Sequence, residues 1–282
     1  MNAKLQNFII RTLSGAVLVS LVLGSLLFCS WAFTTLFALF VGMGLREFHR
    51  ATNQSFHLHI PIWTAVIAGV LLYAAFFQKA SNMGGPALFP IYALWVLGVL
   101  FAELFRKQET AFHHLAYFAL GQLYVALPMA LLNLLLYSET GEWQPVWVLV
   151  MLLTIWINDS FAYIFGILLG KHRLLERISP KKSWEGWFGG LTMSLLFGIA
   201  CHYYLPMLFP TFQSGLALWQ WIVVTGLVVV AATLGDLLES LMKRTMDIKD
   251  YGAIMPGHGG VLDRFDSLLS STIILWAFLT LM

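Results

Sequence analysis

Residues 217–267 read ALWQWIVVTGLVVVAATLGDLLESLMKRTMDIKDYGAIMPGHGGVLDRFDS, an apolar stretch that runs directly into a strongly charged one. A helix needs roughly 20 mainly apolar residues to cross a bilayer, and residues 217–242 provide them. The next part, Ser240–Ser267, combines aspartates, basic pairs and a PGHGG turn in a chain that is only 11% charged and 59% hydrophobic. The pattern predicts a membrane helix with a functional segment at its end.

The composition of the whole chain indicates an integral membrane protein. With 22 Phe and 11 Trp among 282 residues, the chain has more apolar surface than a soluble domain can bury. Its net charge of +2 is too small to indicate nucleic-acid binding. The two cysteines, Cys29 and Cys201, lie in or beside apolar segments, so we interpret them as packing residues rather than as a disulfide framework or a CxxC metal site.

Apolar windows of spanning length occur about nine times, which predicts an all-α polytopic membrane protein with about nine transmembrane helices. The predicted spans are 8–28, 30–46, 61–78, 87–105, 112–137, 146–169, 187–206, 217–242 and 264–282. Pro128 should kink the fifth span. The chain shows no repeat of fixed period and no linker, so residues 1–282 are expected to form a single membrane domain. Within it, residues 1–140 are spans of unspecific pattern and residues 141–282 are the catalytic part.

The basic residues predict the orientation of these spans, because cytoplasmic loops carry an excess of Lys and Arg. With the N-terminus in the cytoplasm and the C-terminus on the far side, Lys79 is the only one of the 16 basic residues outside the cytoplasmic segments. The two longest polar loops, about 170–186 and about 243–263, then both face the cytoplasm.

Asp159, Asp236 and Glu239 are acidic residues inside predicted spans. An acidic residue in a membrane segment costs roughly 2.5–3.5 kcal/mol and usually faces a cavity or a partner. Asp236 and Glu239 share one helix face with Ser240 and Lys243, because residues three, four and seven apart lie on the same side of a helix. In the predicted topology this face descends toward the cytoplasmic surface.

A further acidic pair, Asp263 and Asp266, opens the ninth span. Carboxylates that converge from two helix ends can hold Mg²⁺, which takes oxygen ligands and leaves positions open for phosphate. The alternative is that Asp263 and Asp266 only cap the N-terminus of their helix. That alternative leaves Asp236 unexplained, because a residue inside a span has no capping role.

The PGHGG turn, Pro256–Gly260, comes just before the start of the ninth span. Its glycines would let backbone N–H groups approach an anion, and a helix N-terminus attracts negative charge. Taken alone this signal is weak, because glycine-rich turns also connect helices for ordinary reasons. His258 could ligate a metal, donate to phosphate, or simply form a hydrogen bond within the loop.

The other long polar loop carries Ser179, Lys181, Lys182, Ser183 and Glu185 just before a predicted helix start. Ammonium and hydroxyl groups at such a position could clamp phosphates. Lys-rich cytoplasmic loops are also the norm in membrane proteins, where they orient the chain, so the alternative that these lysines bind no phosphate stays open. The chain has no GxxxxGK[ST] P-loop and no kinase HRD or DFG set, so a nucleotide would have to be held in another way.

The charged segment resembles the signature of the phosphatidate cytidylyltransferases, also called CDP-diacylglycerol synthases. The matching positions are Ser240, Lys243, Arg244, Lys249, Asp250, Pro256, Gly257, His258, Gly259, Gly260, Asp263, Arg264, Asp266 and Ser267. Segments around Asp159, Asp236 and the loop 178–190 are similar to other shared segments of the family. The resemblance covers roughly the C-terminal half of the chain.

The resemblance implies a nucleotidyltransferase of phospholipid biosynthesis that joins CTP and phosphatidate to give CDP-diacylglycerol and pyrophosphate. It implies Mg²⁺ on Asp236 and Asp263, with Asp266 as a third ligand, and K⁺ in the same acidic site. The implied catalytic residues are Asp236, Lys243, Arg244, Asp263, Arg264 and Asp266. The implied substrate-binding residues are Ser179, Lys181, Lys182, Ser183, Glu185, Ser240, Lys249, Gly257, His258, Gly259 and Gly260. We further expect a homodimer in the inner (cytoplasmic) membrane, with its active site facing the cytoplasm.

Two other functions stay open. A transporter would have ionisable residues near the middle of the bilayer and broken helices, whereas the acidic residues here cluster toward one surface. A different CTP-dependent membrane enzyme, such as a polyprenol kinase or a cytidylyltransferase for another lipid phosphate, would differ in the groove that accepts the lipid.

Overall fold

The computed structural model describes residues 3–85, 87–106, 109–254 and 259–282, and their side chains from residue 12 onward. The chain divides into two compact units. Unit 1 comprises Met1–Pro145 and Thr245–Phe265, and unit 2 comprises Val146–Arg244 and Asp266–Met282. Whether both units belong to the single membrane domain expected from the sequence stays a prediction.

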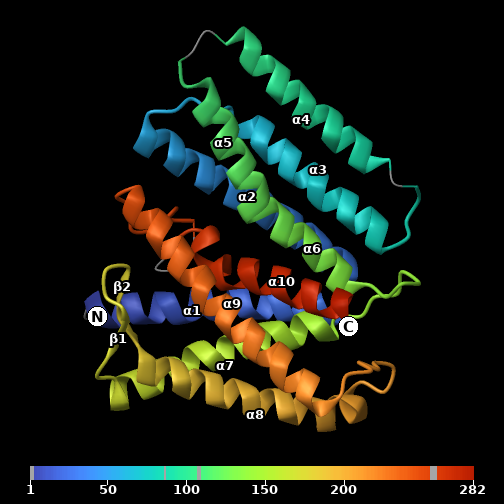
Figure 1. Cartoon of the computed structure of the whole chain (residues 1–282), viewed down its shortest axis with the longest axis vertical. Helices are drawn as coiled ribbons and strands as arrows, with labels where there is room; N and C mark the ends of the chain where they lie inside the picture. Colours follow the sequence, from blue (N-terminus) through green and yellow to red (C-terminus); the bar gives the residue numbers. More distant parts are fainter. Residues whose placement is uncertain (1–2, 86, 107–108, 255–258) are drawn as a thin grey trace. The chain divides into compact units, whose positions relative to one another are not determined.

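Helices make up almost all of the described secondary structure, which confirms the all-α prediction (Figure 1). Unit 1 contains α1 (Ala3–Phe28), α2 (Ser30–Phe56), α3 (Ile62–Ala80), α4 (Leu88–Phe105), α5 (Ala111–Gly121), the π-helix η1 (Gln122–Ala126) and α6 (Leu127–Leu136). Unit 2 contains α7 (Val146–Leu169), β1 (Arg173–Leu175), β2 (Ser179–Ser183) and α8 (Trp184–Leu208). It also contains α9 (Leu218–Thr245) up to Arg244 and α10 (Leu262–Leu281) from Asp266 onward.

Seven helices in the described ranges are long and apolar enough to cross a membrane. They are α3, α4, the continuous helix α5–η1–α6, α7, α8, α9 and α10. In α1 the apolar stretch Thr12–Phe28 is shorter. Helix α2 runs to Phe56, well past the predicted end at residue 46, because Phe48, His49 and Ala51 are buried in unit 1 and packing sustains the helix. The chain is therefore a polytopic membrane protein, and the spans in α1 and α2 stay predictions.

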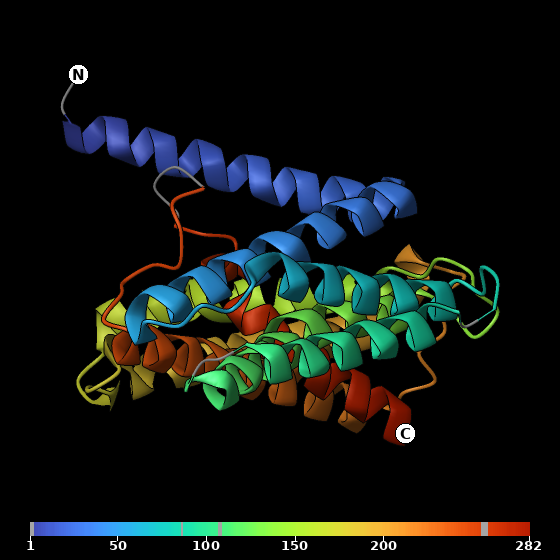
Figure 2. The same ribbon diagram turned by 90° about the horizontal axis from the view of Figure 1, so that it is seen from above.

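In unit 1, α3 packs against α2, against α4 and against the α5–η1–α6 helix (Figures 1 and 2). Gly69 of α3 permits the close approach, because a Cβ there would collide with Leu45 of α2 and lie 3.2 Å from the Cβ of Ala126. Among the residues of α4, only Glu103 is buried. Tyr92, Trp95, Val96 and Val99 pack against the rest of unit 1, whereas side chains such as Leu94 and Leu104 are exposed and available to lipid.

The fifth predicted span contains a π-helical turn where a kink at Pro128 was expected. The N–H of Leu127 bonds to the carbonyl of Gln122, five residues back. Pro128 has no N–H to continue an ordinary helical ladder, and a π turn is a common way to absorb such a break. The Gln122 side chain is buried and donates to the backbone oxygen of Ala65 at 3.0 Å, which ties this turn to α3.

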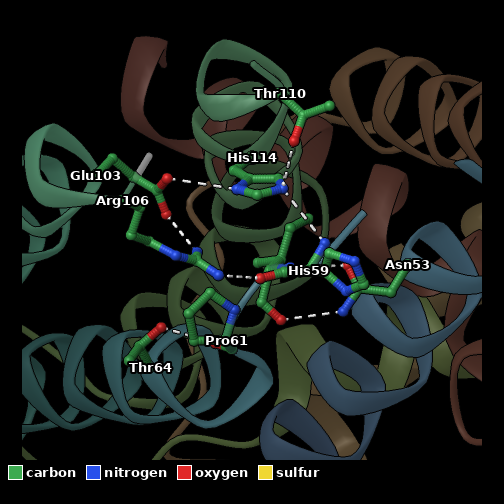
Figure 3. A network of polar contacts seen from close by, with 9 residues as sticks. Asn53, His59, Pro61, Thr64, Glu103, Arg106, Thr110 and His114 are labelled. Carbon is green, nitrogen blue, oxygen red and sulfur yellow. Dashed lines mark hydrogen bonds and ion pairs between the residues drawn. The ribbon is translucent and has the colours of Figure 1, made fainter. Parts of the chain in front are cut away.

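A partly buried polar network joins the end of α4 and the start of α5 to the α2–α3 loop (Figure 3). Arg106 donates to Glu103 Oε1 and to the backbone oxygen of His59, both at 2.6 Å. His114 Nε2 accepts from the backbone N–H of His59 at 3.2 Å, so its Nδ1 carries the proton toward Glu103 Oε2 at 3.3 Å. Glu103 is thus buried with its charge paired, which is the condition for burying a carboxylate.

In unit 2, small residues bring α7 and α8 together. A Cβ on Gly186 would lie 2.6 Å from the backbone oxygen of Ala162, and one on Gly190 would lie 2.6 Å from that of Asn158. Gly186 and Gly190 are one helical turn apart, the spacing that favours close helix contact in membranes. The loop predicted at about 170–186 is partly a short antiparallel hairpin, β1–β2, between these two helices.

Both cysteines are free. Cys201 is buried in α8, in agreement with its interpretation as a packing residue. Cys29 is exposed in the tight turn between α1 and α2, so the packing interpretation is wrong for this residue. The turn leaves its side chain outside the helix contacts.

Candidate metal and phosphate site

Three carboxylates of unit 2 converge, those of Asp236 and Glu239 on α9 and of Asp266 on α10. One oxygen from each lies within 4.8 Å of the others. Glu239 is fully buried, whereas Asp236 and Asp266 are partly accessible. Carboxylates this close repel one another unless a proton or a cation lies among them. A partly open set of oxygen ligands fits Mg²⁺.

A close approach of α9 and α10 creates this cluster. A Cβ on Gly235 would lie 2.8 Å from the backbone oxygen of Asp266 and 2.6 Å from Ser270 Oγ. Further along, Ser271 Oγ donates to the backbone oxygen of Val228 at 3.3 Å. Because residue 235 has no side chain, the carboxylate of the next residue, Asp236, comes within reach of α10.

Two lysines and a serine contact the cluster. Lys182 of β2 forms an ion pair with Asp236, and Lys243 Nζ lies 2.7 Å from Glu239 Oε2. Ser240 Oγ donates to Asp236 Oδ1 at 3.3 Å. The structure therefore brings three of the predicted site residues to the carboxylates, and their contact with substrate stays a prediction.

A fourth acidic residue, Asp159 of α7, belongs to the same neighbourhood. It lies close enough to Lys182, Asp236 and Asp266 for their charges to act on it. The four carboxyl groups outnumber the two lysines that pair with the cluster. Such an excess of carboxyl groups is the kind of ligand set that can hold a cation.

Asp263 belongs to unit 1, where it holds the loop before α10. Its Oδ2 accepts hydrogen bonds from the backbone N–H of Tyr251 at 2.9 Å and of Gly260 at 2.8 Å. These two bonds give Asp263 a structural role at the start of α10, beside which the capping alternative stays open. Its predicted role as a Mg²⁺ ligand stays a prediction.

Glu47 of α2 binds the backbone N–H groups at the start of α10. Its two carboxylate oxygens accept from the backbone N–H groups of Val261 at 3.1 Å and Leu262 at 2.9 Å. Together with Asp263, it engages the N–H groups of three successive residues. A phosphate could use these N–H groups, including that of the predicted anion-binding residue Gly260, only by displacing a protein carboxylate.

Gly259, another predicted anion-binding residue, has a φ of +83°, which favours glycine. A Cβ there would also lie 2.9 Å from Asp263 Oδ2. The adjacent predicted residues Gly257 and His258 lie outside the described residues.

Ser183 and Glu185 hold the hairpin to the start of α8. Ser183 is the N-cap, and its Oγ accepts from the N–H of Gly186 at 3.2 Å. Glu185 accepts from the N–H of Lys171 at 3.1 Å and contacts His172 Nδ1 at 2.6 Å. Both side chains therefore have structural roles in addition to the predicted contact with phosphate.

The remaining predicted residues are accessible to a ligand. Lys181, Arg244, Lys249 and Arg264 are exposed, and Ser179 is partly exposed. Three acidic residues, Asp159, Glu239 and Glu47, were missed as site residues. The spacing of three residues from Asp236 could have identified Glu239 in the sequence. No sequence pattern could have identified Glu47, which contacts a segment 214 residues away.

The comparison with known proteins agrees with this chemistry. A profile described as "Cytidylyltransferase family" matches residues 9–282. A phosphatidate cytidylyltransferase of Mycobacterium leprae is 39% identical over 149 residues, 53% of this chain and 44% of that protein. Those of Staphylococcus saprophyticus (45% over 123 residues, 44% of this chain and 45% of that protein) and Staphylococcus epidermidis (36% over 172 residues, 61% of each) are also similar. The chain thus spans about half the length of the curated relatives it matches.

Proposed function

This chain belongs to the cytidylyltransferase family, and from that premise we propose that it transfers the cytidylyl group of CTP to phosphatidate. The products are CDP-diacylglycerol and pyrophosphate, and the role is in phospholipid biosynthesis. The observation that carries the proposal is the carboxylate cluster of α9 and α10 with Lys182 and Lys243 against it. Such a group of oxygen ligands and ammonium groups suits a metal-bound polyphosphate.

The reaction needs alignment more than it needs a base. A phosphate monoester loses its second proton at a pKa of about 6, so phosphatidate is mostly a dianion near neutral pH and can attack without general-base help. One of its oxygens bonds to the α-phosphorus of CTP. The bond from that phosphorus to the oxygen bridging to the β-phosphate breaks, and pyrophosphate leaves with the electron pair.

The site residues would neutralise and orient the two polyanions. Asp236, Glu239 and Asp266 would hold Mg²⁺, with Asp263 as the further ligand expected from the sequence. When bound, Mg²⁺ supplies positive charge to the α-phosphoryl group and the leaving pyrophosphate. Lysine and arginine side chains would bind the remaining phosphate oxygens and hold the reactants in line. They are Lys182, Lys243, Arg244, Lys249 and Arg264.

We extend the proposal to location and assembly. The basic residues support an inner-membrane protein whose reaction site faces the cytoplasm, since all of them except Lys79 fall in the predicted cytoplasmic segments. The acyl chains of phosphatidate would then stay in the bilayer while CTP arrives from water. K⁺ in the acidic site and a homodimer rest on the family resemblance.

The test is a reaction with purified protein in detergent, Mg²⁺, phosphatidate and each nucleoside triphosphate in turn. We expect CDP-diacylglycerol and pyrophosphate in equal amounts, with CTP only and with no ion gradient. A nucleoside diphosphate in place of pyrophosphate would indicate a kinase. Turnover with another lipid phosphate but not with phosphatidate would refute the acceptor, and absence of any CTP turnover would refute the reaction class.

A further inference from the structure

The contact between Lys182 and Asp236 has a consequence for metal binding. Lys182 Nζ pairs with Asp236 Oδ2, while Ser240 Oγ donates to Oδ1 of the same carboxylate. Both oxygens of Asp236 therefore already have a partner. Since Asp236 is also one of the three converging carboxylates, a cation that uses it must compete with the ammonium group of Lys182.

The two lysines at the cluster differ in how easily they can leave. Lys243 pairs with Glu239 one turn back on the same helix, and its side chain is 15% exposed. Lys182 comes from the short hairpin β1–β2, and the side chains of Lys182 and Asp236 are each 31% exposed. Four flexible methylene groups carry the Lys182 ammonium, so it can move away from Asp236 without disturbing a helix.

The charges favour an exchange when a divalent cation arrives. Without it, two ammonium groups face the three carboxylates Asp236, Glu239 and Asp266. A divalent ion among these carboxylates would repel the ammonium group nearest to it. A bound triphosphate would at the same time offer that ammonium group new oxygen partners, and charge-assisted contacts of this kind are strong.

We propose that Lys182 is an exchangeable counter-ion, which neutralises Asp236 while the divalent cation is absent and binds a phosphate oxygen of CTP once the cation is in place. The inference rests on the proposed function and adds to it the order in which Lys182 changes its partner. Each ligand removes a competitor of the other, so the divalent cation and the nucleotide strengthen each other's binding. A lysine that only fixed the hairpin to α9 would have no such effect.

The test measures Mn²⁺ binding to the full chain in detergent by electron paramagnetic resonance, with no nucleotide or lipid present. Lys182→Met keeps the apolar stem and removes the charge, so Mn²⁺ should bind about fivefold tighter or more, the equivalent of about 1 kcal/mol for a lost ion pair. At saturating Mn²⁺, equilibrium dialysis should show CTP binding about tenfold weaker, because a charge-assisted contact is lost. The two effects have opposite signs.

Matched variants separate this mechanism from general effects. Lys171→Met removes an exposed positive charge from the same loop and should change Mn²⁺ affinity less than about twofold, since exposed distant charges are screened. Lys182→Arg should restore both affinities toward wild type. Lys182→Gln provides a second neutral side chain if the Met variant does not fold, which thermal unfolding of each variant will show.

Mn²⁺ affinity of the neutral Lys182 variants that is unchanged or weaker than wild type would overturn the proposal, as would unchanged CTP affinity. Neither readout requires turnover. A wild-type protein that makes no CDP-diacylglycerol, with the Mn²⁺ and CTP effects as expected, would refute the proposed lipid reaction but support the exchange. An active wild type without these effects would support the proposed lipid reaction but refute the exchange.

Discussion

At the scale of single residues, the site depends on which carboxylates have which partners. Asp236 and Asp266 meet Glu239 within one unit, and Asp263 accepts two backbone hydrogen bonds in the other. The sequence showed that acidic residues inside spans need partners. It did not show that Lys182, far from Asp236 in the chain, is one of them.

Asp236→Asn should reduce CDP-diacylglycerol formation by at least about 100-fold, because loss of a metal ligand removes several kcal/mol of charge stabilisation and about 1.4 kcal/mol corresponds to a factor of ten. The measurement is the initial rate at saturating substrates. Asp247→Asn is the matched control, because Asp247 is exposed and has a φ of 52°, which Asn tolerates. A near wild-type rate for Asp236→Asn at ordinary Mg²⁺ would refute the metal assignment.

Asp263→Asn distinguishes the metal role of Asp263 from its structural role. The Asn side-chain oxygen can still accept from the N–H groups of Tyr251 and Gly260, so the melting temperature should stay close to wild type. Turnover should nevertheless be lost, because an amide is a poor substitute for a carboxylate on Mg²⁺. If Asp263→Asn keeps most activity while Asp263→Ala unfolds more easily, Asp263 holds only the loop.

At the scale of elements, small residues decide how closely helices pack. Gly235 permits the contact of α9 with α10, and Gly186 and Gly190 permit that of α7 with α8. The hairpin β1–β2 begins just after α7 and ends at the N-cap of α8. The contact of α7 with α8 therefore also fixes the position of the backbone that carries Lys182. The spans were predictable from hydropathy, but these close contacts depend on backbone geometry.

Gly186→Ala should destabilise the protein by about 1–3 kcal/mol, because the added Cβ would lie 2.6 Å from the backbone oxygen of Ala162 and backbone cannot easily move aside. The measurement is unfolding in detergent. Gly98→Ala in α4 is the control, because a Cβ there meets nothing within 4 Å. That substitution should be neutral or slightly stabilising. Equal effects of the two substitutions would contradict the packing argument.

At the scale of the whole molecule, the N-terminal half is more than a set of apolar spans. Helix α2 provides Glu47, which is buried and accepts from two N–H groups at the start of α10. Gly252 and Gly260 lie so close that a Cβ on either would meet this carboxylate. The region that resembled the family least thus positions part of its signature segment.

Glu47→Ala should destabilise the protein by about 2–4 kcal/mol, since it leaves two buried N–H groups without acceptors. Glu47→Gln should cost less, because it retains one acceptor oxygen. Thermal unfolding in detergent provides the measurement, and the exposed Glu142→Ala should change little. A neutral Glu47→Ala would mean that the loop before α10 does not depend on α2.

The sequence by itself determined that this chain is an all-helical membrane protein and predicted its cation and phosphate chemistry, because hydropathy, charge and a contiguous signature are properties of short windows. The tertiary structure alone decided that Glu239 joins Asp236 and Asp266, that Lys182 pairs with Asp236, and that Glu47 rather than a ligand occupies the first N–H groups of α10. These contacts join separate elements of the chain. They depend on how closely the backbones pack, which no window of sequence specifies.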